Sequence, residues 1–313
     1  MNFLNLNFGG LKMGKQMKIG EWLDVWFDVY AKPEYAENTV KLYEDARRRL
    51  KRNSADIENR EMKELLPVHF QTAMNRLADR YAKSTIRHIR SLYHMAYDKA
   101  IDNGLCRNNP ISKTTLPKNA PVKKVSAMTK EEQVAFVQAA RTMDVKDQFI
   151  LITYLLTGLR RGELRNLRWS DYDGKKKILF VRRSKTENGI REVPVIPEVA
   201  LMLAHLWGWN KNKKSLNTYI FGGEEPLNVN HLRYICNKVL KLAGIRRVTP
   251  HILRHSFATR LIEAGGEAKS QSLIIGHRDV SFTLKRYVHP DPAQLHSQMM
   301  LLSQVKSKAV NIE

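Results

Sequence analysis

The feature that most constrains the fold is a stretch that carries no helical or strand periodicity and separates two patterned parts of the chain. Residues 109–127 contain three prolines and four lysines, and proline is excluded from helix interiors and central strands. This composition predicts a stiff, extended, cationic linker. We therefore expect two domains, residues 18–108 and 128–306, with a disordered lead at residues 1–17 and a short tail at residues 307–313.

The charge of the chain narrows the choice of partners. Lysine and arginine number 53 against 31 aspartates and glutamates, a formal net charge of +22. Such a surplus repels itself unless an anionic partner neutralises it; nucleic acid is the commonest such partner and an anionic membrane surface the second. The membrane reading is disfavoured, because the sequence has no strongly amphipathic basic helix with a broad apolar face and no span of ~18 apolar residues. With no signal peptide, and with Cys106 and Cys236 isolated, we expect a cytoplasmic protein.

Four helical patterns fill the first domain. Apolar residues recur at spacings of three and four, as at Ile89 and Leu92, which predicts a small all-α domain. Two of the helices carry basic faces, from which we select Arg47, Arg87 and Arg90 as candidates for DNA contact. The four segments are residues 19–31, a helix marked by Tyr43, Ala46 and Leu50, residues 67–80, and a helix that Ser84 caps and Gly104 ends.

The second domain combines helical patterns with one predicted hairpin. Thr129 and Glu132 form a capping-box pattern at its start. Two β-rich apolar runs, residues 177–183 and 190–196, are joined by a turn that ends in Asn188-Gly189. The predicted helices are residues 130–142, 146–157, 160–168, 197–207, 228–243, 250–264 and 267–275, with shorter ones near 279–287 and 291–305.

Two basic residues near the predicted hairpin could either take part in phosphate chemistry or be ordinary surface residues. Arg160 stands where a helix restarts after Gly158, and a guanidinium there can hold a phosphate through two parallel hydrogen bonds. The alternative is a surface arginine paired with Glu163. Lys185 stands on the hairpin tip, from which a lysine can reach a DNA groove or act as a general acid. The alternative is a solvated lysine.

Three further motifs lie in the last third of the chain. A threonine-proline pair is typical of a helix start, so His251 and Arg254 fall in a first turn, on one face, within the positive potential of the helix N-terminus. The alternative is a capping histidine beside a surface arginine. His277 follows a helix-ending glycine and either donates to a phosphate oxygen or completes the helix end. Tyr287 is either a core residue or a nucleophile; as a nucleophile it needs clustered cations, because the pKa of tyrosine is ordinarily ~10.

Taken together, these motifs meet the needs of phosphoryl transfer. Charge builds up on the non-bridging phosphate oxygens and needs donors, a nucleophile must attack, and an acid must protonate the leaving oxygen. Two arginines, a lysine, two histidines and a tyrosine supply all three functions. No cluster of acidic residues or of His and Cys suggests a magnesium or zinc site. We therefore expect no metal and no cofactor, with the cations in the place of a metal.

Four segments resemble the tyrosine recombinase (phage integrase) family: TGLRRGEL (157–164), RSKTENG (183–189), TPHILRHSFATRL (249–261) and IIGHRDVSFTLKRY (274–287). The resemblance covers the whole second domain, and the four helices before it look like the family's core-binding domain. It implies a mainly α, two-domain fold, with an all-α four-helix core-binding domain and a mixed α/β catalytic domain that is mostly helical with a small antiparallel sheet. It also implies a site-specific DNA recombinase that cleaves and rejoins DNA through a 3′-phosphotyrosine and a Holliday junction.

The same resemblance implies a role for each matching residue in holding the phosphate. Arg160 and Arg254 would clamp the scissile phosphate, and His277 would donate to one of its oxygens. Glu163 matches the acidic position that supports the first arginine.

It also implies the covalent chemistry. Tyr287 would attack the phosphate, Lys185 would protonate the leaving 5′-oxygen, and His251 would assist proton movement at the tyrosine. The energy of the broken bond is kept in the phosphotyrosyl link, so no ATP is implied.

The implied partners are a DNA duplex carrying a recombination core site and further copies of the chain, which form a tetramer on two duplexes. A directionality or accessory DNA-bending protein is a further implied partner. Residues 291–305 would pack either on a neighbouring protomer or on their own domain. Basic faces in both domains, with Lys123 and Lys124 in the linker, suggest a clamp around the duplex.

Two other functions remain open from the sequence. A type IB topoisomerase uses the same attack without strand exchange, and it would relax any supercoil rather than act at one site. A DNA-binding regulator would need no nucleophile, so changing Tyr287 to Phe would leave its activity intact.

Overall fold

The computed structural model describes residues 17–122, 125–182, 189–209 and 215–276 of the 313-residue chain. The chain divides into two compact units, Met1–Lys124 and Val125–Glu313, and each contains its own hydrophobic core. No helix in the described part of the chain is long and apolar enough to cross a membrane.

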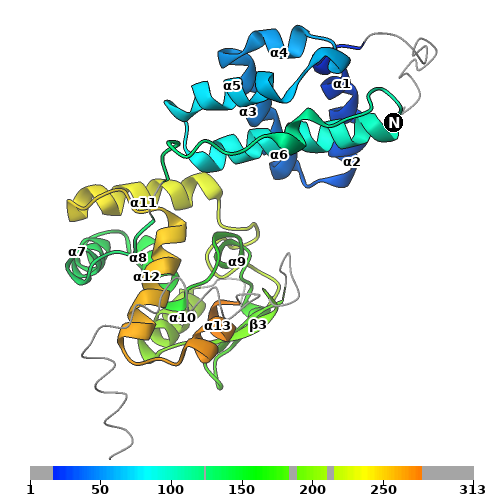
Figure 1. The fold of residues 1–313 in the computed structure, drawn as a ribbon. Coiled ribbons are helices and arrows are strands. Elements are labelled where there is room, and N and C mark those ends of the chain that lie inside the picture. Colours follow the sequence, from blue (N-terminus) through cyan, green and yellow to red (C-terminus); the bar gives the residue numbers. More distant parts are fainter. Residues whose placement is uncertain (1–16, 123–124, 183–188, 210–214, 277–313) are drawn as a thin grey trace, which may run out of the picture. The chain divides into compact units, whose positions relative to one another are not determined.

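The described part of the first unit is helical throughout (Figure 1). Its helices are α1 (Ile19–Trp26), a π-helical turn (Phe27–Ala31), α2 (Lys32–Glu34), α3 (Glu37–Asn53), α4 (Ala55–Asn59), a 3-10 turn (Met62–Glu64), α5 (Pro67–Ala78), α6 (Lys83–Asp102) and a 3-10 turn (Pro110–Lys113). Helix α6 forms the centre, because its Tyr93 and Tyr97 are fully buried and pack against Phe70 of α5. The Trp22 indole N–H of α1 donates to the Ala96 carbonyl of α6 at 2.7 Å, which ties the first helix to the central one.

The segment predicted to be an extended linker is largely packed onto the first unit. Ile111 and Ala120 are buried in its core. Arg90 of α6 donates to the Thr114 hydroxyl at 3.2 Å and to the Ile111 carbonyl at 3.3 Å. The apolar side chains of this proline-rich stretch therefore hold residues 110–121 against α5 and α6, and we call this segment the belt. The boundary between the two units falls after it, between Lys124 and Val125.

The second unit is mostly helical with a small sheet (Figure 1). Its elements are α7 (Lys130–Arg141), α8 (Val145–Thr157), α9 (Arg161–Arg165), a 3-10 turn (Trp169–Asp171), β1 (Tyr172–Asp173), β2 (Ile178–Val181), β3 (Arg191–Pro194), α10 (Pro197–Trp209), α11 (Val229–Ala243), α12 (Pro250–Glu263) and α13 (Ala268–Ile275). The predicted capping box is confirmed, since the Thr129 hydroxyl accepts from the Glu132 N–H at 3.1 Å. The helix predicted over residues 160–168 is instead the short α9 followed by a separate 3-10 turn. The predicted helices near 279–287 and 291–305 lie outside the described residues.

The sheet has the order β1-β2-β3 and is antiparallel. Leu179 of β2 lies opposite Val193 of β3 and both are fully buried, as the apolar alternation of these runs requires. Strands β2 and β3 and their antiparallel pairing were predicted from the sequence, whereas the two-residue β1 was not. The predicted fold class, mainly α with a small antiparallel sheet, is confirmed.

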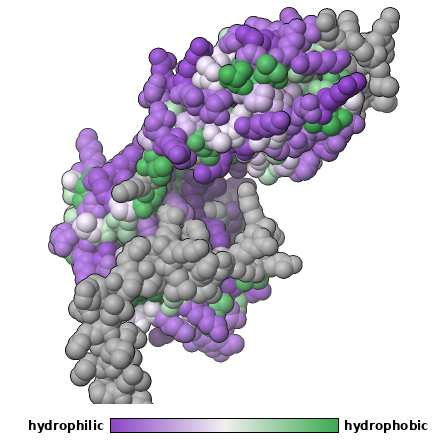
Figure 2. Space-filling model, in the orientation of Figure 1, coloured by the Kyte–Doolittle hydropathy of each residue, from purple (hydrophilic) through white to green (hydrophobic). Residues whose placement is uncertain are grey.

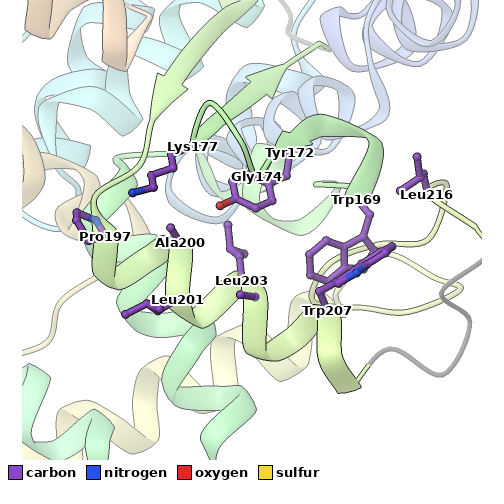
Figure 3. Close-up of a pocket in the computed structure, with 11 residues that line it drawn as sticks. Trp169, Tyr172, Gly174, Lys177, Pro197, Ala200, Leu201, Leu203, Trp207 and Leu216 are labelled. Carbon is purple, nitrogen blue, oxygen red and sulfur yellow. The ribbon is translucent and has the colours of Figure 1, made fainter.

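An apolar pocket of about 510 Å³ lies between α10 and the turn that joins β1 to β2 (Figure 3). Trp169 and Trp207 meet edge to face at its end, with ring centroids 4.9 Å apart, while Leu203 and Lys177 lie along it. These contacts join α10 to the sheet side of the unit.

Candidate functional site

Four elements of the second unit meet around the C-terminal end of α13. This helix packs against both α12 and β3 (Figure 1), and the start of α9 joins them through its side chains. The last carbonyl groups of a helix have no partner within the helix, and cations are favourable beside them. The sequence supplies those cations as arginines from three different elements.

Three guanidinium groups donate to three consecutive carbonyl oxygens at this helix end. Arg191 Nε lies 2.6 Å from the Ile274 oxygen. Arg254 Nη2 lies 2.6 Å from the Ile275 oxygen. Arg160 Nη2 lies 2.6 Å from the Gly276 oxygen. Because the acceptors are consecutive, the guanidinium groups gather at one place.

Glu163 organises two of these arginines. Its carboxylate accepts from Arg160 Nη1 at 2.7 Å, and from Arg191 at 3.0 Å and 2.9 Å. Burial opposes ionisation of Glu163, but the hydrogen bonds and charge of Arg191, with hydrogen bonds from Arg160, outweigh it and hold its pKa below the usual value. With Arg254, the four side chains carry three positive charges and one negative, so the cluster has a surplus of positive charge and suits an anion.

Helix α12 presents its first turn at the same cluster. Pro250 is its first residue, as predicted, and Thr249 stands at the capping position, although its hydroxyl makes no capping hydrogen bond. His251 is exposed in this turn and Arg254 is buried, with 4% of its surface exposed. His251 is therefore in the first turn, as predicted, whereas Arg254 is the fifth residue of the helix and begins the second turn. Both lie near the helix N-terminus, where the helix dipole favours anions.

Gly158 allows the close approach between α8 and α12. It ends α8 in the left-handed conformation, with φ of 61°, and its carbonyl accepts from Arg254 Nη1 at 2.7 Å. A Cβ atom at this position would lie 2.4 Å from the ring of Phe257. Glycine is thus required here both by the conformation and by the contact.

Residues 126–294 match the model of the phage integrase family. The chain belongs to this family. It is therefore a tyrosine recombinase, an enzyme that breaks and rejoins DNA in site-specific recombination.

Individual relatives are similar to different shares of the chain. A tyrosine recombinase XerC-like protein of Caldanaerobacter subterraneus is 27% identical, over 94% of this chain and 83% of its own length. The transposase from transposon Tn916 of Enterococcus faecalis is 26% identical, over 73% of this chain and 64% of its own length. Tyrosine recombinase XerA of Thermococcus onnurineus is 30% identical, over 54% of this chain and 58% of its own length.

Two solved structures share the fold of this integrase-family chain. The Tn1549 transposon integrase in complex with circular intermediate DNA superposes with a TM-score of 0.73 at 20% identity, covering 90% of this chain and 99% of that one. A lambda integrase dimer bound to a core site gives a TM-score of 0.70 at 20% identity, covering 87% of this chain and 96% of that one.

The structure brings together the family-motif residues that it describes. Arg160, Glu163 and Arg254 form the cluster, and His251 lies on the first turn of α12 beside Arg254. The remaining predicted catalytic and linker residues, Lys123, Lys124, Lys185, His277 and Tyr287, lie outside the described residues.

The three candidate DNA contacts of the first unit differ in their surroundings. Arg87 is exposed on α6. Arg90 is turned toward the belt described above. Arg47 is held by two carboxylates of its own unit, the buried Glu58 at 3.0 Å and Asp24 at 2.5 Å, and only 18% of its side chain is exposed.

Sequence reasoning missed Arg191, although the sequence carries a signal for it. Arg191, Val193 and Val195 alternate along β3 and beyond it, and the two valines are buried. An arginine on the apolar side of a strand must find a partner, because an unpaired buried charge is costly. That partner is Glu163, and the Arg191 side chain is only 5% exposed.

Proposed function

We propose that this recombinase uses Arg160, Arg254 and Tyr287 to cleave one DNA strand at a time. The two arginines would bind the non-bridging oxygens of the scissile phosphate. The Tyr287 oxygen would attack phosphorus, and the bond from phosphorus to the 5′-oxygen would break. The free 5′-hydroxyl of a partner strand would then attack the phosphotyrosine and release Tyr287, which completes the exchange without ATP.

The observation that carries this proposal is the gathering of guanidinium groups at the end of α13. Arg160 and Arg254 donate to consecutive carbonyl oxygens, so a single phosphate can contact both. Glu163 fixes the orientation of Arg160. Donors that are already in place stabilise developing charge without a cost of reorganisation when the reaction occurs.

Proton transfers are assigned to the remaining motif residues. Lys185 would protonate the leaving 5′-oxygen, and His251 would accept the phenolic proton of Tyr287. His277 follows Gly276 directly in the sequence, next to the carbonyl that binds Arg160, and would donate to a phosphate oxygen. The arginines supply the positive charge that a metal ion provides in many phosphoryl transferases, so no metal is required.

DNA would be bound by both units, as a clamp. The first unit would act as the core-binding domain, and hydrophilic side chains cover much of its visible face (Figure 2). Arg87 is the proposed phosphate contact on α6, with Lys123 and Lys124 beyond the belt. Arg47 and Arg90 stay proposed DNA contacts, and their hydrogen bonds to Glu58 and Thr114 would also hold that surface in place.

Strand exchange would take place in a tetramer on two duplexes through a Holliday junction. Residues 291–305 would supply contacts between protomers, and an accessory DNA-bending or directionality protein would set the direction of exchange. The setting is the bacterial nucleoid in the cytoplasm.

Trapping of the covalent complex tests the nucleophile without knowledge of the target site. Wild type and Tyr287→Phe would be incubated with fragmented host DNA in EDTA, denatured in SDS and examined for protein that carries DNA. We expect an adduct with wild type and none with Tyr287→Phe; sequencing the attached DNA would identify the site. Tyr234→Phe, which alters an exposed tyrosine of α11, is the matched control and should retain the adduct.

Each other outcome has a definite meaning. An adduct with Tyr287→Phe would show that another residue is the nucleophile. No adduct with wild type, despite salt-sensitive binding, would favour the DNA-binding regulator. Cleavage without strand transfer, together with relaxation of any supercoil, would favour the topoisomerase.

A further inference from the structure

A groove of about 850 Å³, lined mainly by polar and charged residues, opens beside Arg160, on the side of α9 that faces β2. Its walls come from α9, the 3-10 turn that follows, β2 and the segment at Asn217–Tyr219. The volume lies within the range of small-ligand sites, ~300–1,000 Å³. Because Arg160 also lines it, the groove continues directly from the proposed phosphate site.

Two arginines in this groove lie over aromatic rings. The Arg168 guanidinium is 4.6 Å from the centre of the Tyr219 ring, and it is fixed by hydrogen bonds to the Tyr219 hydroxyl at 2.9 Å and the Asn217 carbonyl at 3.0 Å. The Arg182 guanidinium is 5.1 Å from the centre of the Phe180 ring. Aromatic rings and guanidinium planes are the surfaces on which proteins stack unpaired nucleic-acid bases.

The charge of the lining favours a nucleic-acid strand. Arg160, Arg168 and Arg182 contribute positive charge, and the acidic side chains of the described lining are already paired. Glu163 binds Arg160 and Arg191, and Asp171 binds Arg182 at 3.1 Å. A phosphate entering the groove would therefore meet cations and neutralised carboxylates.

We propose that this groove is a subsite for an unpaired nucleotide of the DNA strand whose scissile phosphate is bound by Arg160. The inference rests on the proposed function, because strand exchange requires base pairs beside the cleaved phosphate to open. An opened base loses its stacking partner in the duplex. The paired arginine–ring surfaces replace that partner, and so lower the cost of opening at the point where the strand must leave.

The test compares equilibrium binding of two labelled duplexes of equal length, one fully paired and one with a short central mismatch that leaves bases unpaired. It uses the full-length Tyr287→Phe protein, so no cleavage takes place and the outcome does not depend on the nucleophile. We expect the mismatched duplex to bind about 10-fold more tightly than the paired one, the size of one base stacked on an aromatic or guanidinium surface.

Two further changes, each made in this background, separate stacking from charge. Arg182→Gln removes a platform whose side chain is 62% exposed, so the unit should fold. Tyr219→Phe keeps the ring but removes the hydroxyl that holds Arg168. The matched control is Lys176→Gln, which removes one exposed charge outside the groove.

The proposal predicts that Arg182→Gln loses most of the preference for the mismatched duplex, that Tyr219→Phe loses part of it, and that Lys176→Gln keeps it. Equal loss of affinity for both duplexes in Arg182→Gln would overturn the subsite, since the groove would then contribute only charge. The subsite would also be overturned if the Tyr287→Phe protein, without any further substitution, bound the mismatched and the paired duplex equally well. Neither result tests the role of Tyr287, which the formation of the covalent adduct decides separately.

Discussion

At the scale of single residues, the ion pair of Glu163 and Arg191 is the least expected feature of the site. Both side chains are nearly buried, at 6% and 5% exposed, so each charge has given up its hydration. Such a pair contributes little net stability compared with apolar residues, but loss of one partner leaves an uncompensated charge. The pair therefore acts mainly on geometry, because it holds Arg160 and the end of α13 in one arrangement.

This reasoning predicts the effect of Arg191→Ala. The free energy of unfolding of the second unit should fall by about 3 kcal/mol, since Glu163 would remain buried with one guanidinium partner fewer. Urea denaturation followed by tryptophan fluorescence would measure it. Arg182→Ala is the control: its ion pair with Asp171 has an arginine that is 62% exposed, so its loss should cost less than about 1 kcal/mol. If both variants lost the same free energy of unfolding, burial of the Glu163–Arg191 pair would not explain the loss in Arg191→Ala.

At the scale of elements, the junction between α8 and α12 depends on one glycine. Gly158→Ala should destabilise the unit by more than about 1 kcal/mol, because the new Cβ meets the Phe257 ring at 2.4 Å and φ is 61°. It should also reduce DNA cleavage, since the Gly158 carbonyl holds Arg254. Gly244→Ala provides the control, having nearly the same φ of 64° and nothing within 4 Å of the added atom.

The comparison isolates the contact from the backbone strain, which both variants share. Thermal unfolding of the two proteins, with adduct formation on the identified site, would measure both effects. If Gly244→Ala lost as much stability and cleavage as Gly158→Ala, the contact with Phe257 would have no particular importance.

The elements also show what sequence reasoning can reach. The start of α12 was predictable because capping by threonine and proline is a local preference, and β2 and β3 were predictable from alternation. The packing of residues 110–121 was not, because burial of Ile111 and Ala120 depends on surfaces of α5 and α6 that only the folded unit presents. The ion pair of Arg47 was not predictable either, because its partner Glu58 lies eleven residues away, on another helix. From the sequence alone, Arg47 belonged only to a basic helix face.

At the scale of the whole molecule, positive charge is the dominant property. The formal net charge of +22 is far larger than the local surplus at the α13 end, so we expect most of it to act through many weak contacts with DNA phosphates. Each neutralised phosphate releases counterions, and the logarithm of the binding constant then falls by about 0.9 for each tenfold rise in salt per contact.

This predicts a steep salt dependence with a measurable contribution from single residues. Affinity for a DNA duplex should fall by about 10³-fold or more between about 50 and 200 mM salt, if six or more phosphates are contacted. Arg87→Gln should reduce the slope of the logarithmic plot by about one, whereas Lys63→Gln, an exposed lysine on another part of the first unit, should leave it unchanged. Binding that hardly changed over this range would refute the clamp. If both variants gave the same steep slope of affinity against salt, the clamp would still hold. The DNA contact of the first unit would then lie somewhere other than the exposed face of α6.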